Sequence, residues 1–155
     1  RSNMLTDIDS KDNSILSSRA DIKMQNRFIP SPTTPLQTVV YSAAISAPLD
    51  DGYVIHSDTF YYNGKVCVLR NLLESSIIQV VEVSTGLPLV DNIGSYSATD
   101  GIVSLVNFTG TLITGSYIRI TALPANPSVI NPLRSSIIRY DAQASRARAV
   151  LTDTL

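Results

Sequence analysis

The sequence is poor in the side chains on which enzymes and metal sites depend. It has one cysteine (Cys67), one histidine (His56), no tryptophan, and only two glutamates, Glu74 and Glu82. A single thiol excludes an intramolecular disulfide, and one thiol with one histidine cannot form a structural zinc site. An esterase or glycosidase needs a positioned nucleophile or a pair of carboxyl groups. It is therefore the least favoured class of function, and we expect no cofactor.

Charged residues and long apolar runs are also scarce. Charged residues make up 16% of the chain, and 12 Lys and Arg against 13 Asp and Glu leave a net charge of -1, so no overall field attracts nucleic acid. No apolar run approaches the roughly 20 residues of a membrane helix, and residues 1–14 are too polar for a signal peptide. We expect no nucleic-acid, membrane or small-molecule partner. Because the chain begins with Arg1 rather than Met, we also expect it to be a piece of a longer protein.

What the sequence does contain is a series of turn signals between β-branched runs. Asp100-Gly101 predicts a tight reversal into the alternating strand 102–106, and Asn63-Gly64 has the composition of a two-residue hairpin turn. Thr85-Gly86 repeats the arrangement. Turns at such intervals predict an all-β fold, an antiparallel sandwich or a barrel-like sheet, with short helical or irregular segments only at the ends.

The chain divides into three parts. Residues 1–19 are read as an N-terminal arm, residues 20–123 as the antiparallel β domain, and residues 124–155 as a proline-broken linker with a C-terminal association segment. At the start of the domain, apolar and polar residues alternate until Asn26 interrupts the alternation, and Pro30 ends the segment, which predicts a strand that ends at a proline. At its end, alternation over 117–122 places Ile118, Ile120 and Ala122 on one face.

Two candidate catalytic groups favour structural roles. His56, Ser57 and Asp58 are the residue types of a catalytic triad, but neighbours on a strand point to opposite faces, so His56 and Ser57 cannot share the required hydrogen bond. Cys67 lies between Val66 and Val68 in an apolar strand, which indicates a buried, inert thiol.

Three further motifs also have structural explanations. Asp50, Asp51 and Asp58 lack the ligand spacing of a calcium loop and indicate a solvated turn. Phe60 and Tyr62 share one face of a strand, which favours core packing, while Tyr61 lies on the other. Asn107 begins a glycosylation sequon, which has meaning only in a eukaryotic secretory pathway.

Four stretches together resemble one protein family. They are "DIKMQNRFIP", "AAISAPLDDGYVIHSDTFYY", "NIGSYSATDGIVSLVNF" and "YIRITALPANPSVINPLRSSIIRYD". In order and spacing, over residues 20–141, they resemble the C-terminal part of the baseplate wedge protein of T-even-like contractile-tailed phages. The resemblance implies a non-enzymatic structural subunit of the virion tail baseplate, assembled in the bacterial host cytoplasm. Its implied partners are a second copy and other wedge proteins, in a ring around the tail tube.

The alternative is a secreted β-sandwich module for adhesion or carbohydrate binding, which would use Tyr53 or Tyr61 as an exposed stacking platform. For self-association, the C-terminal segment is the candidate. Residues 134–155 hold four arginines against two aspartates, whereas residues 1–133 hold eight basic against eleven acidic residues. The apolar side chains expected in the contact are Ile137, Ile138, Tyr140, Val150 and Leu151.

Overall fold

The computed structural model of the chain describes residues 22–128, which contain nine strands and no helix. The strands are β1 (Met24–Phe28), β2 (Leu36–Val40), β3 (Ile55–Ser57), β4 (Phe60–Tyr62), β5 (Lys65–Asn71), β6 (Ile77–Glu82), β7 (Pro88–Ser97), β8 (Ile102–Val106) and β9 (Ile118–Ala122). The expected arm over 1–19 and the association residues Ile137, Ile138, Tyr140, Val150 and Leu151 lie outside the described residues.

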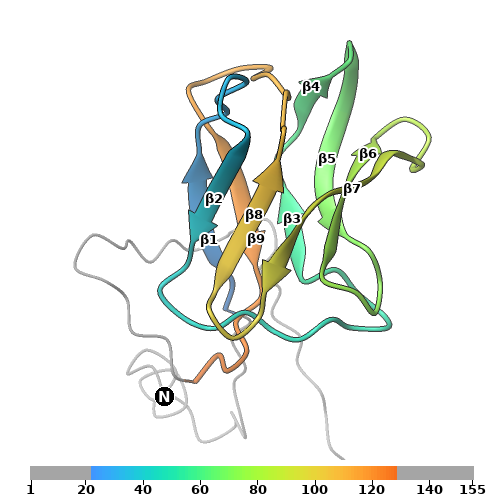
Figure 1. The fold of residues 1–155 in the computed structure, drawn as a ribbon. Helices are drawn as coiled ribbons and strands as arrows, with labels where there is room; N and C mark the ends of the chain where they lie inside the picture. Colours follow the sequence, from blue (N-terminus) through green and yellow to red (C-terminus); the bar gives the residue numbers. More distant parts are fainter. Residues whose placement is uncertain (1–21, 129–155) are drawn as a thin grey trace, which may run out of the picture.

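The strands form one antiparallel sheet that curls until it is nearly closed into a barrel (Figure 1). Its order is β1-β9-β3-β5-β6-β7-β8-β2, and β4 adds to β5 off this path. The all-β, barrel-like expectation is therefore confirmed. β1 and β2 are the two ends of the sheet, and no backbone ladder joins them.

The interior of the barrel is filled by alternate residues of the strands. In β9 the predicted apolar set, Ile118, Ile120 and Ala122, is fully buried, while Arg119 and Thr121 point outward. Phe108 meets Phe28 and Phe60 edge to face, with ring centroids 5.6 and 5.1 Å away. This geometry is favourable for aromatic rings.

The predicted hairpin turns are present, but they differ in length. At Asn63-Gly64 both residues have positive φ, 49° and 77°, and Tyr62 faces Lys65, so this is a two-residue turn as predicted. At Asp100-Gly101 the hairpin is confirmed, but Ser97 pairs with Ile102, which leaves a loop over residues 98–101.

The expectation of a tight reversal at Asp100-Gly101 is wrong. The turn is wider, because Ser97 hydrogen-bonds to Asp100 across it. The Ser97 hydroxyl donates to the Asp100 carboxylate at 2.7 Å and accepts from the Asp100 N–H at 3.3 Å. Only Gly101 then needs positive φ, at 68°.

The strand predicted before Pro30 is present, and it includes Asn26, the residue that interrupts its apolar alternation. β1 continues through Asn26 to Phe28, and Asn26 lies opposite Ile120 of β9. The polar side chain is tolerated because it has partners: its amide NH₂ donates to the Val40 carbonyl, and its oxygen accepts from the Arg27 N–H, both at 2.8 Å.

One end of the barrel is crossed by residues 44–46, which follow β2. Ile45 N–H donates to the Ala98 carbonyl, Ser46 N–H to that of Leu123, and Ala125 N–H donates back to that of Ala44, at 2.8 to 2.9 Å. The chain after β9 therefore leaves the barrel beside the chain that follows β2. This is also the end at which β1 begins, since Met24 faces Ala122.

Candidate functional site

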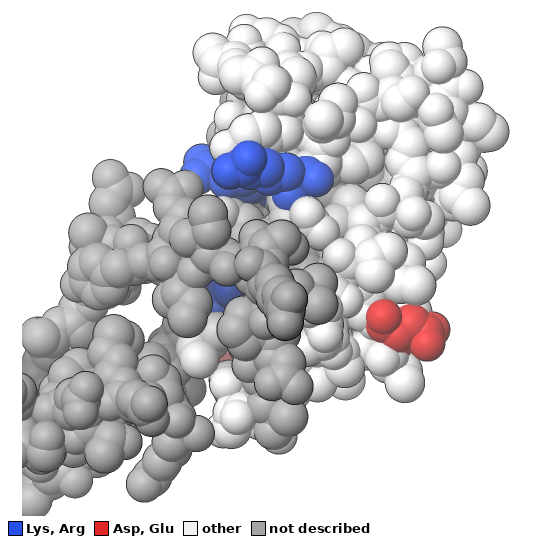
Figure 2. Space-filling model, turned by 90° about the vertical axis from the view of Figure 1, so that its left-hand side faces the viewer, with Lys and Arg blue, Asp and Glu red and all other residues white. Residues whose placement is uncertain are grey.

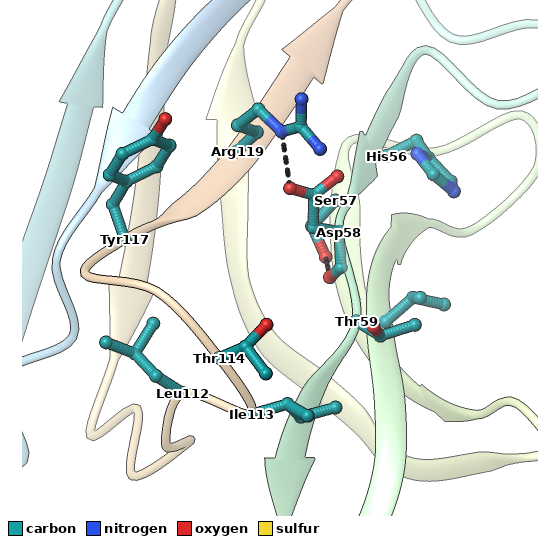
Figure 3. Close-up of a pocket in the computed structure, with 10 residues that line it drawn as sticks. His56, Ser57, Asp58, Thr59, Leu112, Ile113, Thr114, Tyr117 and Arg119 are labelled. Carbon is teal, nitrogen blue, oxygen red and sulfur yellow. Dashed lines mark hydrogen bonds and ion pairs between the residues drawn. The ribbon is translucent and has the colours of Figure 1, made fainter.

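A shallow cleft of about 430 Å³ lies on the outer surface beside β3 and β9. Figure 3 shows the segment with Leu112, Ile113 and Thr114 on one side of it, facing the segment from His56 to Thr59. Arg119 and Tyr117 complete the wall. The cleft therefore has an aliphatic side and a polar side.

The charged groups of the cleft are paired. The Arg119 guanidinium donates to the Asp58 carboxylate at 2.6 Å, and both side chains are about two-fifths exposed. This hydrogen bond and the nearby negative charge raise the pKa of Arg119. Arg27, directly opposite Arg119 on β1, lies over the ring of Tyr117, 4.7 Å from its centroid. Each arginine therefore has a favourable partner: Arg119 has the Asp58 carboxylate, and Arg27 has the ring of Tyr117.

The structure separates the members of the rejected triad. His56 is exposed, whereas Ser57 is fully buried on the other face of β3. The Ser57 hydroxyl donates to the Asp58 carbonyl at 2.7 Å and accepts from the Leu69 N–H at 2.8 Å. The prediction that His56 and Ser57 point to opposite faces is confirmed, and Ser57 joins two strands.

Of the other residues singled out in the sequence, Cys67 and Phe60 have packing roles and the two tyrosines lie at the surface. Cys67 is fully buried, which raises the pKa of its thiol, and Phe60 is buried in the core. Tyr61 is exposed as predicted, whereas one face of the Tyr53 ring is covered by Arg70, 4.7 Å from the ring centroid. Within residues 22–128, no group of three or more His, Cys, Asp or Glu side chains could hold a metal ion.

A different surface is formed by the outward side chains of β2, β8 and the end of β7. Leu36 faces Val106, Val40 faces Ile102, and Thr38, Ser104 and Ser95 form a row of hydroxyls between these two pairs. We call this surface the neutral face: Leu36, Thr38, Val40, Ser95, Ser97, Ile102, Ser104 and Val106. It contains no charged side chain, although Leu36, Val40 and Val106 are 56%, 58% and 49% exposed.

The side of the molecule that carries β1 and β2 is shown in Figure 2. Most of the lysine and arginine side chains visible there form a band, an acidic patch lies apart from it, and most of the other described surface in this view is uncharged.

Sequence reasoning missed the neutral face because it considered residue types that carry chemistry. The signal was present in the alternation of 36–40 and 102–106. In each run the core-facing set, such as Val39, Val103 and Leu105, alternates with a set that contains no charge. Outward positions of a half-buried strand normally carry polar groups, so aliphatic residues there indicate a second covered face.

Comparison of the chain with protein-family models, curated proteins and solved structures gave no match in any of the three. In the described part of the chain, no helix has the length and apolar character needed to cross a membrane.

Proposed function

We propose that this chain is a non-enzymatic structural subunit of a contractile phage tail baseplate wedge, which associates with a second copy of itself and with other wedge proteins. The neutral face carries the proposal. Half-exposed aliphatic side chains on two neighbouring strands, with no charge between them, have the composition of an interface core, from which charged residues are depleted. The family resemblance over residues 20–141 supports the particular assembly.

The chemistry of the cleft also favours an assembly role. Asp58 and Arg119 of the cleft neutralise each other in an ion pair. The hydroxyl of Ser57 is occupied by hydrogen bonds to two backbone groups. A nucleophile must instead be free to attack and must be activated by a neighbouring base.

The mass of the full chain in solution tests self-association. By light scattering we expect the wild type to have at least twice the mass of one chain, and Val106→Lys to weaken the association at least about tenfold, because it places a charge in the contact. The matched control is Thr121→Lys, which adds the same charge on the outward side of β9. A wild type that is monomeric at all concentrations would contradict self-association. Equal masses for Val106→Lys and the wild type would exclude the neutral face.

The particular assembly needs its own test. Contractile-tail particles produced from the genome that encodes this chain should contain it in baseplates, in a fixed ratio to the other wedge proteins, when purified baseplates are analysed by mass spectrometry. Recovery of the chain only as a free secreted protein would overturn the assignment.

The carbohydrate-binding alternative depends on Tyr61, which is 42% exposed on β4. It predicts glycan binding that Tyr61→Ala abolishes, and Tyr61→Phe, which keeps an aromatic ring, should retain it. Binding of this kind on a glycan array would favour the alternative over the structural role.

A further inference from the structure

The outer surface of β1, β9, β3 and β5, four neighbouring strands of the sheet, differs in charge from the neutral face. On their outward side these strands carry Arg27, Arg119 and Arg70 and no acidic residue, although the described part of the chain holds more acidic than basic residues. Figure 2 shows a band of basic side chains on the side of the molecule that carries β1. Positive charge is therefore concentrated on one surface of a domain that is acidic as a whole.

Two of these arginines form a pair of like charges at the cleft. Arg27 and Arg119 lie directly opposite each other on β1 and β9, an arrangement that is unfavourable unless an anion compensates it. Asp58 compensates Arg119. Among residues 22–128 no carboxylate forms an ion pair with Arg27, whose partner is the uncharged ring of Tyr117. The pair thus keeps one positive charge that the described residues do not balance.

The two guanidinium groups also have hydrogen-bond donors to offer. Arg119 uses its Nε–H for Asp58, and within the described chain its two NH₂ groups and the Arg27 guanidinium make no further hydrogen bond. Arg27 is exposed, and the Arg119 side chain is 43% exposed. The planar fork of a guanidinium matches the two oxygens of a carboxylate. The pair can therefore receive one carboxylate from solvent or from another molecule.

The opposite wall of the cleft narrows the choice of ligand. Leu112 and Ile113 are half-buried there, and Figure 3 shows them across the opening from Arg119. A group that covers this wall has to be aliphatic. A phosphate polymer would leave the wall uncovered and would be repelled by Asp58, and a stacked sugar ring would find one face of Tyr117 covered by Arg27. A peptide with an acidic residue beside an aliphatic one matches both walls.

We propose that the cleft beside β3 and β9 docks an acidic segment of a partner protein. A carboxylate of that segment binds Arg27 and Arg119, and a neighbouring aliphatic side chain packs on Leu112 and Ile113. This inference rests on the proposed structural function. It assigns the contact with another wedge protein to the cleft, whereas the neutral face contacts the second copy.

Titration of the full chain with short capped peptides tests the proposal, with the side-chain N–H signals of Arg27 and Arg119 followed by NMR. The probe is valyl-glutamyl-valine amide. Valyl-glutaminyl-valine amide keeps the shape and lacks the charge, and glycyl-glutamyl-glycine amide keeps the charge and lacks the aliphatic groups. We expect saturable binding of the probe, and binding at least about tenfold weaker for each of the other two, because each loses one of the two contacts.

A variant pair separates the site from the general field of the surface. Arg27→Gln should weaken binding of the probe at least about tenfold, and it should melt as the wild type does because Arg27 is exposed and faces a like charge. Lys23→Gln removes the same charge four residues away and should bind the probe as the wild type does. Equal weakening by the two variants would overturn the site.

The aliphatic wall has its own variant. Ile113→Ser should weaken binding of valyl-glutamyl-valine amide, and should leave the binding of glycyl-glutamyl-glycine amide unchanged, because only the first peptide reaches the wall. If both peptides lost affinity to the same extent, the wall would not contact the ligand and the peptide assignment would fail.

The remaining outcomes distinguish this inference from the proposed function. Tighter binding of oligothymidylate or of glucuronic acid than of the probe would overturn a peptide as the occupant. A chain that is dimeric and present in baseplates, but does not bind the probe, would overturn the docking site and leave the structural function intact. A chain that binds the probe at Arg27 and Arg119, but is absent from baseplates, would support the site and contradict the baseplate assignment.

Discussion

Two sides of the same barrel are joined in different ways. Where β7 meets β8, backbone pairs with backbone so closely that Gly94, opposite Leu105, leaves no room for a side chain. Where β1 meets β2, which we call the seam, no backbone ladder forms. The Asn26 side chain of β1 donates to the Val40 carbonyl of β2, Gln37 of β2 accepts from Ser31 in the connection after β1, and an open groove remains. The difference indicates that the β7–β8 side of the barrel is joined more tightly than the seam.

The largest effect is expected at Gly94 on the tightly paired side. A Cβ atom at this position would overlap the carbonyl oxygen of Ser104, and φ is 157°. Because the obstacle is backbone, Gly94→Ala should cost at least about 3 kcal/mol of unfolding free energy, measured by urea denaturation. Gly52→Ala, whose Cβ meets nothing within 4 Å, is the control. A loss below about 1 kcal/mol would mean that the two strands can separate without much cost.

The next largest effect is expected at the turn between the same two strands. Gly101 has a φ of 68°, and a Cβ there would lie 2.5 Å from the Ala43 carbonyl oxygen. Gly101→Val should therefore cost about 1 to 3 kcal/mol through backbone strain and displacement of the loop after β2. An unchanged melting temperature would contradict this account of the turn.

On the seam side, Gln37 of β2 has the larger expected effect. It is 6% exposed, and it satisfies the Ser31 N–H and the Phe108 carbonyl. Gln37→Leu should cost about 1 to 3 kcal/mol, because both backbone groups lose their partner. Gln25→Leu, on the exposed side of β1, should be nearly neutral in the same denaturation experiment. Equal effects of the two variants would show that the hydrogen bonds of Gln37 do not stabilise the fold.

The smallest effect is expected at Asn26, whose hydrogen bonds are near solvent. Asn26→Ala should cost no more than about 1 kcal/mol, because water replaces the lost bonds. It should nevertheless accelerate exchange of amides along the seam, which NMR can follow against the Val103 amide. If exchange instead became faster between β7 and β8, the contrast between the two sides of the barrel would not hold.

Local signals predicted much of the fold. Asn63-Gly64 specified its turn because both residues tolerate positive φ and the paired strands are adjacent in sequence. The alternation of 118–122 specified which residues face the core, because side chains of a strand alternate strictly between its two faces. For the same reason, the separation of His56 from Ser57 was predictable before the fold was known.

Features that depend on distant residues were not predictable in this way. Asn26 interrupts an apolar alternation, and only its contact with Val40 explains it. Gln37 looks like an ordinary polar position until its contact with Phe108 is known. The cleft pairs Asp58 with Arg119, 61 positions away. None of these contacts can be recognised from the neighbouring residues in the sequence.

The sequence by itself determined that the described part of the chain is all-β and where its hairpins lie. These properties follow from backbone preferences and from a two-residue period, which act over a few neighbouring positions. Only the tertiary structure decided that the sheet curls almost into a barrel, and that β1 and β2 meet through the side chain of Asn26 rather than through a backbone ladder. It also decided that uncharged positions from β2, β7 and β8 form one surface. Closure brings together strands remote in the sequence, and their relation is set by sheet twist and core packing rather than by any local pattern.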